Sequence, residues 1–417
     1  MSDRRVSSTL VHPPPFAAAI GGALEGRTIL QIVPRLDEGG AEQTTLDIAS
    51  ALVAAGARAI VASEGGRLVA DLQARGGVFA PFPAATKNPF GMALAAPRLR
   101  RLMGAEGVDL VHVRSRAPAW VALSACRATR TPLVTTWHGA YGDRSAVKRR
   151  YNSVMARGDV VIANSQWTAD VVRRLHPEAG PRIAAIPRGI DLRLFSPEAV
   201  EPERVRRLRA EWGVEPDDRV VLAPARLARR KGHLILVQAA KRLAGTGERL
   251  VFVCAGDSEG RGAVRAEIER AAKAAGLAGA VRCVGHCDDM PAAYLAAGAV
   301  VVPSVEPEAF GRVSAEAQAM GAPVVVTDLG AAAETVLSPP QTPAGARTGW
   351  RVKAGDPAAL ANGLAEALSL RAAARDALGA RARAHVAGRF SLERMTGATL
   401  EIYARLIDHA GRAARRA

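Results

Sequence analysis

Short apolar runs alternate along the chain with longer stretches in which apolar residues recur at helical spacing. In the first half these runs occupy 29–33, 59–62, 110–113, 133–136 and 160–163. In the second half the same rhythm returns at 220–223, 250–255, 281–284, 299–302 and 323–326. Strands that alternate with helices are typical of doubly wound α/β domains with parallel sheets. We therefore predict one such domain in each half.

A change of composition separates the two halves. A turn-rich passage over 187–197 runs into a charged stretch over 198–209. With 417 residues, the chain also exceeds the size at which a single hydrophobic core usually splits. We therefore expect two domains of similar size. The expected divisions are a disordered tail, a first domain, a second domain and a last helix, at 1–26, 27–195, 196–390 and 391–417.

The chain carries a large positive charge. Apolar residues make up 49% and charged residues 23%, which is ordinary for a globular protein, but the formal net charge is +16. Such a surface attracts nucleic acid, anionic membranes or phosphorylated substrates. A nucleic-acid binder should show basic stripes lined with aromatic residues, which are only 4% of this chain, so we expect no nucleic-acid partner. The excess is mostly arginine in an alanine-rich chain, as GC-rich codon usage would also produce, so the charge supports the other partners without deciding between them.

The cysteines and the N-terminal stretch limit the cellular setting. Four scattered cysteines are too few for a disulfide framework and predict a reducing cytoplasm. Cys283, His286 and Cys287 resemble a metal cluster, but Cys283 ends an apolar strand and no second pair of ligands lies nearby in sequence. We therefore expect no metal site. The apolar stretch 16–24 is too short to span a bilayer.

Two glutamates frame a Phe-Gly turn in the second half. The sequence from Glu308 to Glu316 reads Glu-Ala-Phe-Gly-Arg-Val-Ser-Ala-Glu and follows the apolar run 299–303. A helix is predicted over 311–320, because Gly321 is a natural stop. Glu308 would then lie just before the helix, and Glu316 would lie within it.

The start of this helix suits a sugar attached to a phosphate. Its first backbone N–H groups have no partner within the helix, and together with the helix dipole they favour an anion such as a diphosphate. The expected donors belong to Phe310, Gly311, Arg312 and Val313. Glu308 would then reach hydroxyls of a hexose, and Glu316 would reach the two hydroxyls of a ribose. The alternative is an ordinary helix start with surface charges.

A loop rich in cations follows the first strand of the second half. It reads Ala-Arg-Leu-Ala-Arg-Arg-Lys-Gly over 225–232. Arg226 and Lys231 bracket this loop before a helix, so both side chains can face one anionic group. Fixed cations at such a point stabilise the charge that develops on a departing diphosphate. The alternative is an exposed basic loop.

Two features of the first half lie at the ends of strands. Gly39 and Gly40 precede the first helix and would let backbone N–H groups approach a phosphate, although a plain glycine turn is the simpler interpretation. His138 follows the run 133–136, at the carboxyl end of a strand, where open α/β sheets bind ligands. The alternative for His138 is a purely structural role.

These motifs occur in an order that resembles the family-4 retaining glycosyltransferases. The segment from Glu308 to Glu316 is similar to the family's Glu-x7-Glu signature, and the loop 225–232 is similar to its Gly-Arg-Leu-x3-Lys-Gly, with Ala225 in place of the first glycine. The Gly-Gly-Ala-Glu turn of the first half resembles the family's donor-facing loop. The family also places a histidine at the strand end that His138 occupies.

The resemblance extends over about 28–410 and implies an α/β fold of the GT-B type. Two Rossmann-like domains would face each other across a cleft, with the acceptor on the first and the nucleotide sugar on the second, and the last helix would cross back to the first domain. A hexose would be transferred with retention of configuration from a donor such as a UDP- or GDP-hexose. Glu308 would orient the sugar and His138 would contact it near the reacting carbon, while Arg226 and Lys231 would hold the diphosphate.

The sequence also bears on cofactors and on other activities. It contains no Asp-x-Asp pair, the clamp with which metal-dependent transferases hold a divalent ion, so we expect a reaction without a metal or other cofactor. Two other interpretations stay open, a nucleotide-sugar epimerase of the same architecture and a non-catalytic scaffold that binds a nucleotide sugar. No motif favours the epimerase, and the intact charged residues of the expected site argue against the scaffold.

A basic segment follows the His138 loop on the expected acceptor domain. Lys148, Arg149 and Arg150 form one face of a predicted helix, and an apolar stripe that includes Val147 forms the other. Such a helix could rest on an anionic membrane, although packing of the stripe on its own domain is the commoner arrangement. We expect a glycan or lipid-linked acceptor, as in lipopolysaccharide or other envelope polysaccharide synthesis, and an enzyme at the inner face of the cytoplasmic membrane.

Overall fold

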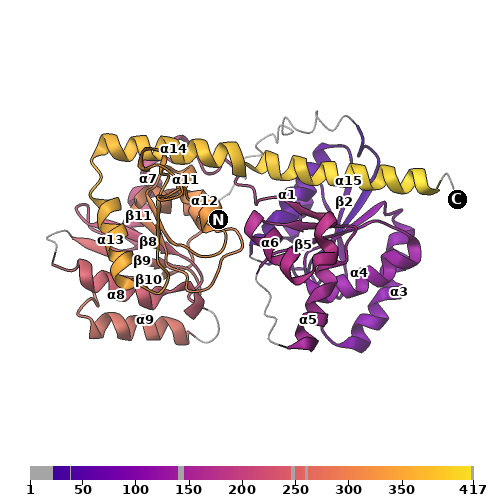
Figure 1. The fold of residues 1–417 in the computed structure, drawn as a ribbon, viewed down its shortest axis with the longest axis horizontal. Coiled ribbons are helices and arrows are strands. Elements are labelled where there is room, and N and C mark those ends of the chain that lie inside the picture. The colour runs from indigo at the N-terminus through magenta and orange to yellow at the C-terminus, as the bar shows by residue number, and fades with distance from the viewer. Residues whose placement is uncertain (1–21, 38, 140–144, 246–248, 259–261, 415–417) are drawn as a thin grey trace, which may run out of the picture.

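The structure, a computed structural model, describes residues 22–37, 39–139, 145–245, 249–258 and 262–414. Figure 1 shows two lobes side by side, with the helices α14 (Ala372–Phe390) and α15 (Leu392–Ala414) running along one side of both. Each lobe contains one parallel sheet. The predicted two-domain α/β architecture is confirmed.

Seven parallel strands form the sheet of the first domain, in the order β3-β2-β1-β4-β5-β6-β7. Its central strands are buried along their whole length, as expected where helices cover both faces. The strand order reverses between β1 and β4, so the carboxyl ends of these two strands border a crevice. The strands are β1 (Thr28–Ile32), β2 (Arg58–Ser63), β3 (Val78–Pro81), β4 (Leu110–Val113), β5 (Leu133–Trp137), β6 (Val160–Ala163) and β7 (Ile183–Ala185).

Helices cover both faces of this first sheet. Leu99 of α3 and Val121 of α4 pack on one face, whereas Leu46 of α1 and Tyr403 of α15 pack on the other. The helices of this domain are α1 (Gly40–Ala54), α2 (Val69–Ala74), α3 (Pro89–Ala105), α4 (Arg116–Thr129), α5 (Ala146–Asn152) and α6 (Gln166–Leu175).

Six parallel strands form the second sheet, in the order β10-β9-β8-β11-β12-β13. Leu236 of α8 and Leu364 of α13 pack on one face, and Leu208 of α7 and Ala317 of α11 pack on the other. The strands are β8 (Arg219–Pro224), β9 (Leu250–Ala255), β10 (Val281–Gly285), β11 (Ala297–Val302), β12 (Val324–Thr327) and β13 (Trp350–Val352). The helices besides α14 are α7 (Pro202–Glu211), α8 (His233–Leu243), α9 (Ala263–Ala274), α10 (Met290–Ala296), α11 (Arg312–Ala319), α12 (Ala332–Thr335) and α13 (Pro357–Leu368).

All predicted strands are present with shifts of no more than about two residues at their ends. The strands that the sequence pattern did not indicate are β3, β7 and β13, and each lies at the edge of its sheet. Edge strands are short and only partly buried, so their apolar pattern is weaker than that of the central strands.

Within the described residues the chain crosses between the domains twice, and the two crossings are joined. The N–H of Ile190 donates to the carbonyl oxygen of Phe390 at 2.7 Å, and the N–H of Leu392 donates to the carbonyl oxygen of Ile190 at 2.9 Å. Gly189 permits this contact, because a Cβ at that position would lie 2.6 Å from the Cα of Leu392. The result is a two-stranded hinge.

The last helix, α15, belongs to the core of the first domain although it follows the second in sequence. Leu400, Ile402, Tyr403 and Ile407 are buried against β-strands and α1 of the first domain. Full burial of one large apolar side chain contributes roughly 1.5–3 kcal/mol, so the helix is an integral part of this domain. The predicted crossing-back of the last helix is therefore confirmed.

The described chain begins inside the stretch that was expected to be a disordered tail. Residues 22–26 form a turn, and the side chain of Leu24 is 1% exposed in the core that contains α1. Ordered packing therefore starts before β1, whereas residues 1–21 of the expected tail lie outside the described residues.

A carboxylate of the second domain binds the start of a helix in the first. The two oxygens of Glu334, in α12, accept hydrogen bonds from the N–H groups of Gln166 and Trp167 at 2.8 and 2.6 Å. These are the first two residues of α6, where unpaired N–H groups and the helix dipole favour a negative charge. Glu334 therefore holds the two domains together at this edge of the interface.

We expect Glu334→Ala to shift the protein toward an open arrangement of the domains. Hydrogen bonds to a charged group contribute about 1.5–3 kcal/mol each, so the closed population should fall by roughly tenfold or more. Small-angle X-ray scattering should show a larger radius of gyration than for wild type. Glu401→Ala, an exposed glutamate on α15 near the same groove, is the matched control. An unchanged radius for Glu334→Ala would show that Glu334 does not hold the domains together.

Candidate active site

The two charged motifs of the second domain meet at the carboxyl end of its sheet. The Nζ of Lys231 donates to Oε1 of Glu308 at 2.6 Å, and the hydroxyl of Ser304 donates to the same oxygen at 2.5 Å. Burial alone would raise the pKa of the Glu308 carboxyl, but Lys231 and Ser304 hold it below its ordinary value. Glu308 is therefore a fixed negative charge beside a fixed positive one.

The loop that carries Lys231 lies directly against the end of β11. Gly232 adopts a left-handed conformation with φ of 72°, and a Cβ there would lie 1.8 Å from the carbonyl oxygen of Pro303. The N–H of Val305 also donates to the carbonyl oxygen of Arg230 at 2.9 Å. Arg226, at the start of the same loop, is exposed. The glycine of the motif is therefore explained by close backbone packing.

The helix α11 begins without a side-chain cap. Gly311 is its N-cap with φ of 86°, and no side chain caps the first turn. Phe310 is buried and makes an edge-to-face contact with Phe390 at 5.3 Å, which fixes the loop. The N–H groups of Arg312 and Val313 thus stand at a helix end next to the Glu308–Lys231 pair.

Glu316 is buried and fully engaged within the protein. Its side chain accepts hydrogen bonds from the hydroxyl of Tyr294 at 2.8 Å and from Nε of Arg312 at 2.5 Å. Burial, Glu316 and its hydrogen bond raise the pKa of Tyr294 well above its ordinary value. A ribose could contact Glu316, as predicted, only if it shared this carboxylate with Arg312 or Tyr294. The sequence pattern did not indicate these two partners.

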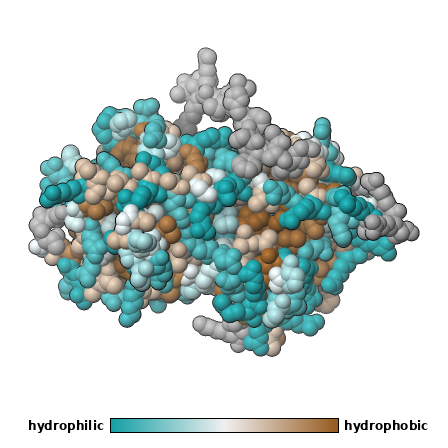
Figure 2. All heavy atoms as spheres, turned by 45° about the horizontal axis from the view of Figure 1, so that its top comes forward, coloured by the Kyte–Doolittle hydropathy of each residue, from teal (hydrophilic) through white to brown (hydrophobic). Residues whose placement is uncertain are grey.

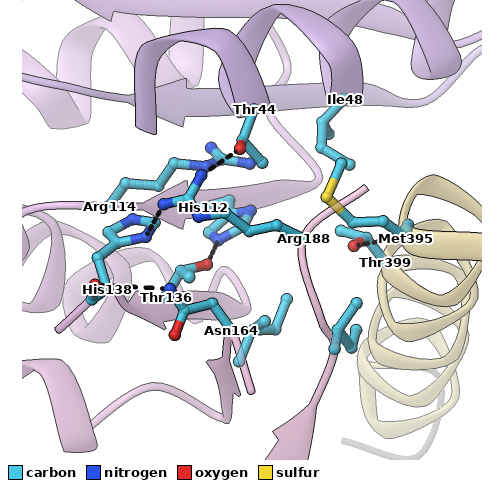
Figure 3. Close-up of a pocket in the computed structure, with 12 residues that line it drawn as sticks. Thr44, Ile48, His112, Arg114, Thr136, His138, Asn164, Arg188, Met395 and Thr399 are labelled. Atoms are coloured by element: carbon cyan, nitrogen blue, oxygen red, sulfur yellow. Dashed lines mark hydrogen bonds between the residues drawn. The ribbon is translucent and has the colours of Figure 1, made fainter. Parts of the chain in front are cut away.

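The first domain presents Gly39 and Gly40 at the start of α1, at the carboxyl end of β1. Arg188, from the passage before the hinge, donates to the carbonyl oxygen of Gly40, and it donates to the hydroxyl of Thr44 at 2.5 Å. Its other terminal nitrogen donates to Nδ1 of His138 at 3.0 Å (Figure 3). Arg188 therefore links the two predicted features of this domain, and no motif in the sequence had singled it out.

His138 is a neutral hydrogen-bond donor. Burial, followed by Arg188 and Arg114, lowers the pKa of His138 well below its ordinary value. Because a guanidinium group can only donate, Nδ1 of His138 is the acceptor and Nε2 carries the proton. Its position at the end of β5 and its fixed tautomer suit it to donate a hydrogen bond to a sugar hydroxyl rather than to act as a base.

Side chains of both domains come together around this site. The hydroxyl of Thr168, in α6, donates to the carbonyl oxygen of Ala309 at 3.2 Å, next to Glu308. Burial raises the pKa of Asp47 on α1, and the positive charge of Arg312 across the interface opposes that shift. Burial, followed by Arg312, also lowers the pKa of Arg188, which bonds to Gly40 and His138, so Arg312 at the start of α11 acts across the interface on this group of the first domain.

The basic segment on α5 is solvent-exposed, as predicted, but its apolar stripe is divided. Lys148, Arg149 and Arg150 are exposed, and Val147 is 80% exposed. Val154 is fully buried, because α5 ends at Asn152 and a 3-10 turn carries the chain into the core. Residues 140–144, between this helix and the His138 strand, lie outside the described residues.

Two further findings concern metals and membranes. Among the described residues, no group of three or more His, Cys, Asp or Glu side chains is arranged to hold a metal ion. Within the same ranges, no helix combines the length and the hydropathy needed to cross a lipid bilayer.

Comparisons with known proteins extend over almost the whole chain. The Glycosyltransferase Family 4 model matches residues 38–194, and the Glycosyl transferases group 1 model matches residues 205–385. A D-inositol 3-phosphate glycosyltransferase of Geodermatophilus obscurus is 30% identical, over 99% of this chain and 92% of its own length.

Solved structures agree with these matches. A glycosyltransferase from Rickettsia africae superposes with a TM-score of 0.83 at 30% identity and covers 92% of this chain and 99% of its own. The Anabaena protein HepE, crystallised with UDP and glucose, superposes with a TM-score of 0.78 at 24% identity, over 91% of this chain and all of its own.

Proposed function

Because the chain belongs to the family-4 glycosyltransferases of the GT-B type, we propose that it transfers a hexose from a nucleotide diphosphate sugar to a glycan or lipid-linked acceptor, with retention of configuration. The observation that carries this proposal is the Glu308–Lys231 pair at the open end of α11, opposite the neutral His138 of the first domain. Charges of both signs are thus fixed where a sugar diphosphate would bind.

In the proposed reaction, an acceptor hydroxyl oxygen bonds to the anomeric carbon on the face from which the diphosphate leaves. The bond between that carbon and the phosphate oxygen breaks, and the leaving phosphate oxygen takes the proton of the acceptor. Lys231, Arg226 and the amides of α11 would stabilise the departing diphosphate, and Glu308 and His138 would position the sugar. No metal or other cofactor is proposed, because these cations take the place of a divalent ion.

For the donor and the acceptor we propose chemical classes rather than single compounds. The curated relatives carry a name that specifies a phosphorylated acceptor, which favours an acceptor that also bears a phosphate. UDP-glucose is the first donor to test, followed by other UDP- and GDP-hexoses. Release of free nucleotide diphosphate from any of them, measured with and without acceptor, tests the proposal. Conversion of the donor to an epimer without release of nucleotide would instead identify an epimerase, and binding without turnover would identify a scaffold.

We expect Glu308→Gln and Glu316→Gln to affect different steps. Because Glu308 would contact the hexose, Glu308→Gln should lower turnover by about tenfold or more with little change in nucleotide affinity. Glu316→Gln should weaken nucleotide binding. Steady-state kinetics and calorimetric titration with UDP separate the two effects. The exposed Glu203 on α7 of the same domain, changed to Gln, is the control. Turnover of Glu308→Gln within about twofold of wild type would contradict the assignment.

We expect activity to persist in excess EDTA and to depend on the cationic loop. Lys231→Ala and Arg226→Ala should each lose roughly two orders of magnitude in turnover, as expected when a charge-stabilising group is removed. Arg229→Ala is the control in the same loop, because Arg229 instead pairs with Glu267 at 3.1 Å. Loss of activity in EDTA that manganese restores would overturn the metal-free mechanism.

We also propose that the first domain associates peripherally with an anionic membrane, where a lipid-linked envelope glycan such as lipopolysaccharide would be presented. Exposed Phe90 and Leu94 on α3 and Val147 on α5 place apolar side chains on the domain that also carries Lys148 to Arg150. Figure 2 shows hydrophobic surface on this lobe among hydrophilic residues. Each basic residue near an anionic surface contributes about 1 kcal/mol, so three of them favour reversible binding.

We expect salt-sensitive binding to anionic vesicles that weakens when Lys148, Arg149 and Arg150 are all changed to Gln. At about 1 kcal/mol per residue, the loss should approach two orders of magnitude at low salt, with donor hydrolysis unchanged. Vesicle sedimentation measures the binding. The control changes Arg265, Arg270 and Lys273 to Gln on the exposed face of α9. Equal binding by wild type and the α5 variant would favour a soluble acceptor.

A further inference from the structure

Arg114 is a buried arginine with unused hydrogen-bond donors. It directly follows β4 and is 3% exposed. Its guanidinium group donates a hydrogen bond to the hydroxyl of Tyr403, but its Nε and Nη1 atoms have no partner among the described residues. Burial of a charged group without a counter-charge is unfavourable, so these two N–H groups indicate a missing partner.

The surroundings of Arg114 are cationic. It lines a small cavity with Arg188, His112 and His138, and Figure 3 shows the two arginines entering this cavity from different elements. None of the twelve residues that line the cavity, all of them within the described ranges, is acidic. Two carboxylates outside this lining act on the arginines by charge: Glu42 and Asp47 on Arg188, and Asp47 on Arg114. Asp47 is also engaged with Gln43 at 2.9 Å. The positive charge of the cavity is therefore offset only from outside its lining, and no carboxylate lines the cavity itself.

The position of the cavity also favours a ligand. It lies at the carboxyl ends of β4 and β5, next to the point at which the strand order of the first sheet reverses. This is where open parallel sheets bind ligands. The network behind it is rigid, because Tyr403 also bonds to His112, whose other ring nitrogen lies 2.6 Å from the hydroxyl of Thr136. A group that enters the cavity therefore meets donors that are already oriented.

The size of the cavity restricts what can enter. Its volume of about 20 Å³ is little more than one water molecule requires, so a sugar ring does not fit. The oxygens of a carboxylate or the tip of a phosphate do fit, and both match the planar fork of a guanidinium group.

We propose that this cavity binds a small oxyanion, a phosphate monoester or a carboxylate, through Arg114, with the Nε2–H of His138 beside it. The assignment of that oxyanion to the acceptor rests on the proposed function, because the donor diphosphate has its own cations, Lys231 and Arg226, on the second domain. The anion would anchor the acceptor close to His138. A negative charge on the acceptor would thus be a requirement of this enzyme, and uncharged acceptors of the same shape would bind poorly.

The test measures anion binding while the donor site is filled. The full-length protein is saturated with UDP and titrated calorimetrically with inorganic phosphate and, separately, with acetate at constant ionic strength. We expect wild type to bind at least one of the two anions and Arg114→Met to lose that binding by about tenfold or more, with UDP affinity unchanged within about twofold. The matched control is Arg100→Met, which removes an exposed arginine from α3 of the same domain.

A second measurement covers the case in which Arg114→Met does not fold. With UDP present, the bound anion should raise the melting temperature of wild type and of Arg100→Met by about 2 °C or more over an equal ionic strength of sodium chloride, and Arg114→Lys should show a smaller shift. The difference between phosphate and acetate identifies the class of oxyanion.

Three outcomes would overturn the inference. The first is that UDP-saturated wild type binds neither phosphate nor acetate, and the second is that wild type and a folded Arg114 variant bind the anion equally. The third is that UDP abolishes the binding of phosphate, which would assign the cavity to the donor diphosphate. Failure of UDP to bind at all would contradict the proposed function instead. In that case, loss of phosphate binding in the Arg114 variants would still support the anion site.

Discussion

Within the described residues, the two passages of the chain between its domains lie side by side. Backbone hydrogen bonds between Ile190 and the residues on either side of Ser391 join them. The placement of the two halves of the site relative to each other depends on this hinge, because Glu308 and Lys231 belong to one domain and His138 to the other. Two hydrogen-bonded strands resist twisting more than a single linker would, so the domains can open and close while their facing residues keep the same alignment. The close approach of Gly189 to Leu392 makes this alignment depend on a residue without a side chain.

The two sides of the site differ in how their charges are balanced. On the second domain the two motif carboxylates each have a cation beside them, Glu308 with Lys231 and Glu316 with Arg312. On the first domain Arg114 and Arg188 line the cavity together, and no carboxylate lines it. His138 stays neutral because burial, followed by the charges of Arg188 and Arg114, lowers its pKa. The diphosphate of a nucleotide-sugar donor can take the place of Glu308 beside Lys231. Arg114 and Arg188 instead require a ligand that brings a negative charge to the first domain.

The architecture and the charged motifs could be predicted because they depend on local patterns. Buried strands such as β9 and β12 show nearly continuous apolar runs, and the Phe-Gly turn before α11 has a stereochemical reason, the left-handed Gly311. The pairing of Glu316 with Tyr294 could not be predicted in this way, because Tyr294 lies on α10 and the contact depends on how two helices pack. The same holds for Arg188 and Arg114, which no spacing rule connects to His138. The sequence shows the type of each residue and its position relative to a strand. That Arg114, Arg188 and His138 come together follows only from the order of the strands in the sheet.

The arginine-rich composition illustrates this limit. Counted along the sequence, each arginine adds equally to the net charge of +16 and is as readily explained by codon usage as by function. In the structure the arginines differ: Arg206 forms an exposed pair with Glu203 of the kind that contributes little, whereas Arg114 is buried with donors unused. Codon usage accounts for exposed arginines, which cost little, but it gives no reason for a buried arginine with unpaired donors, which is unfavourable. The proposed anion would supply the partner that Arg114, at the end of β4, lacks among the described residues.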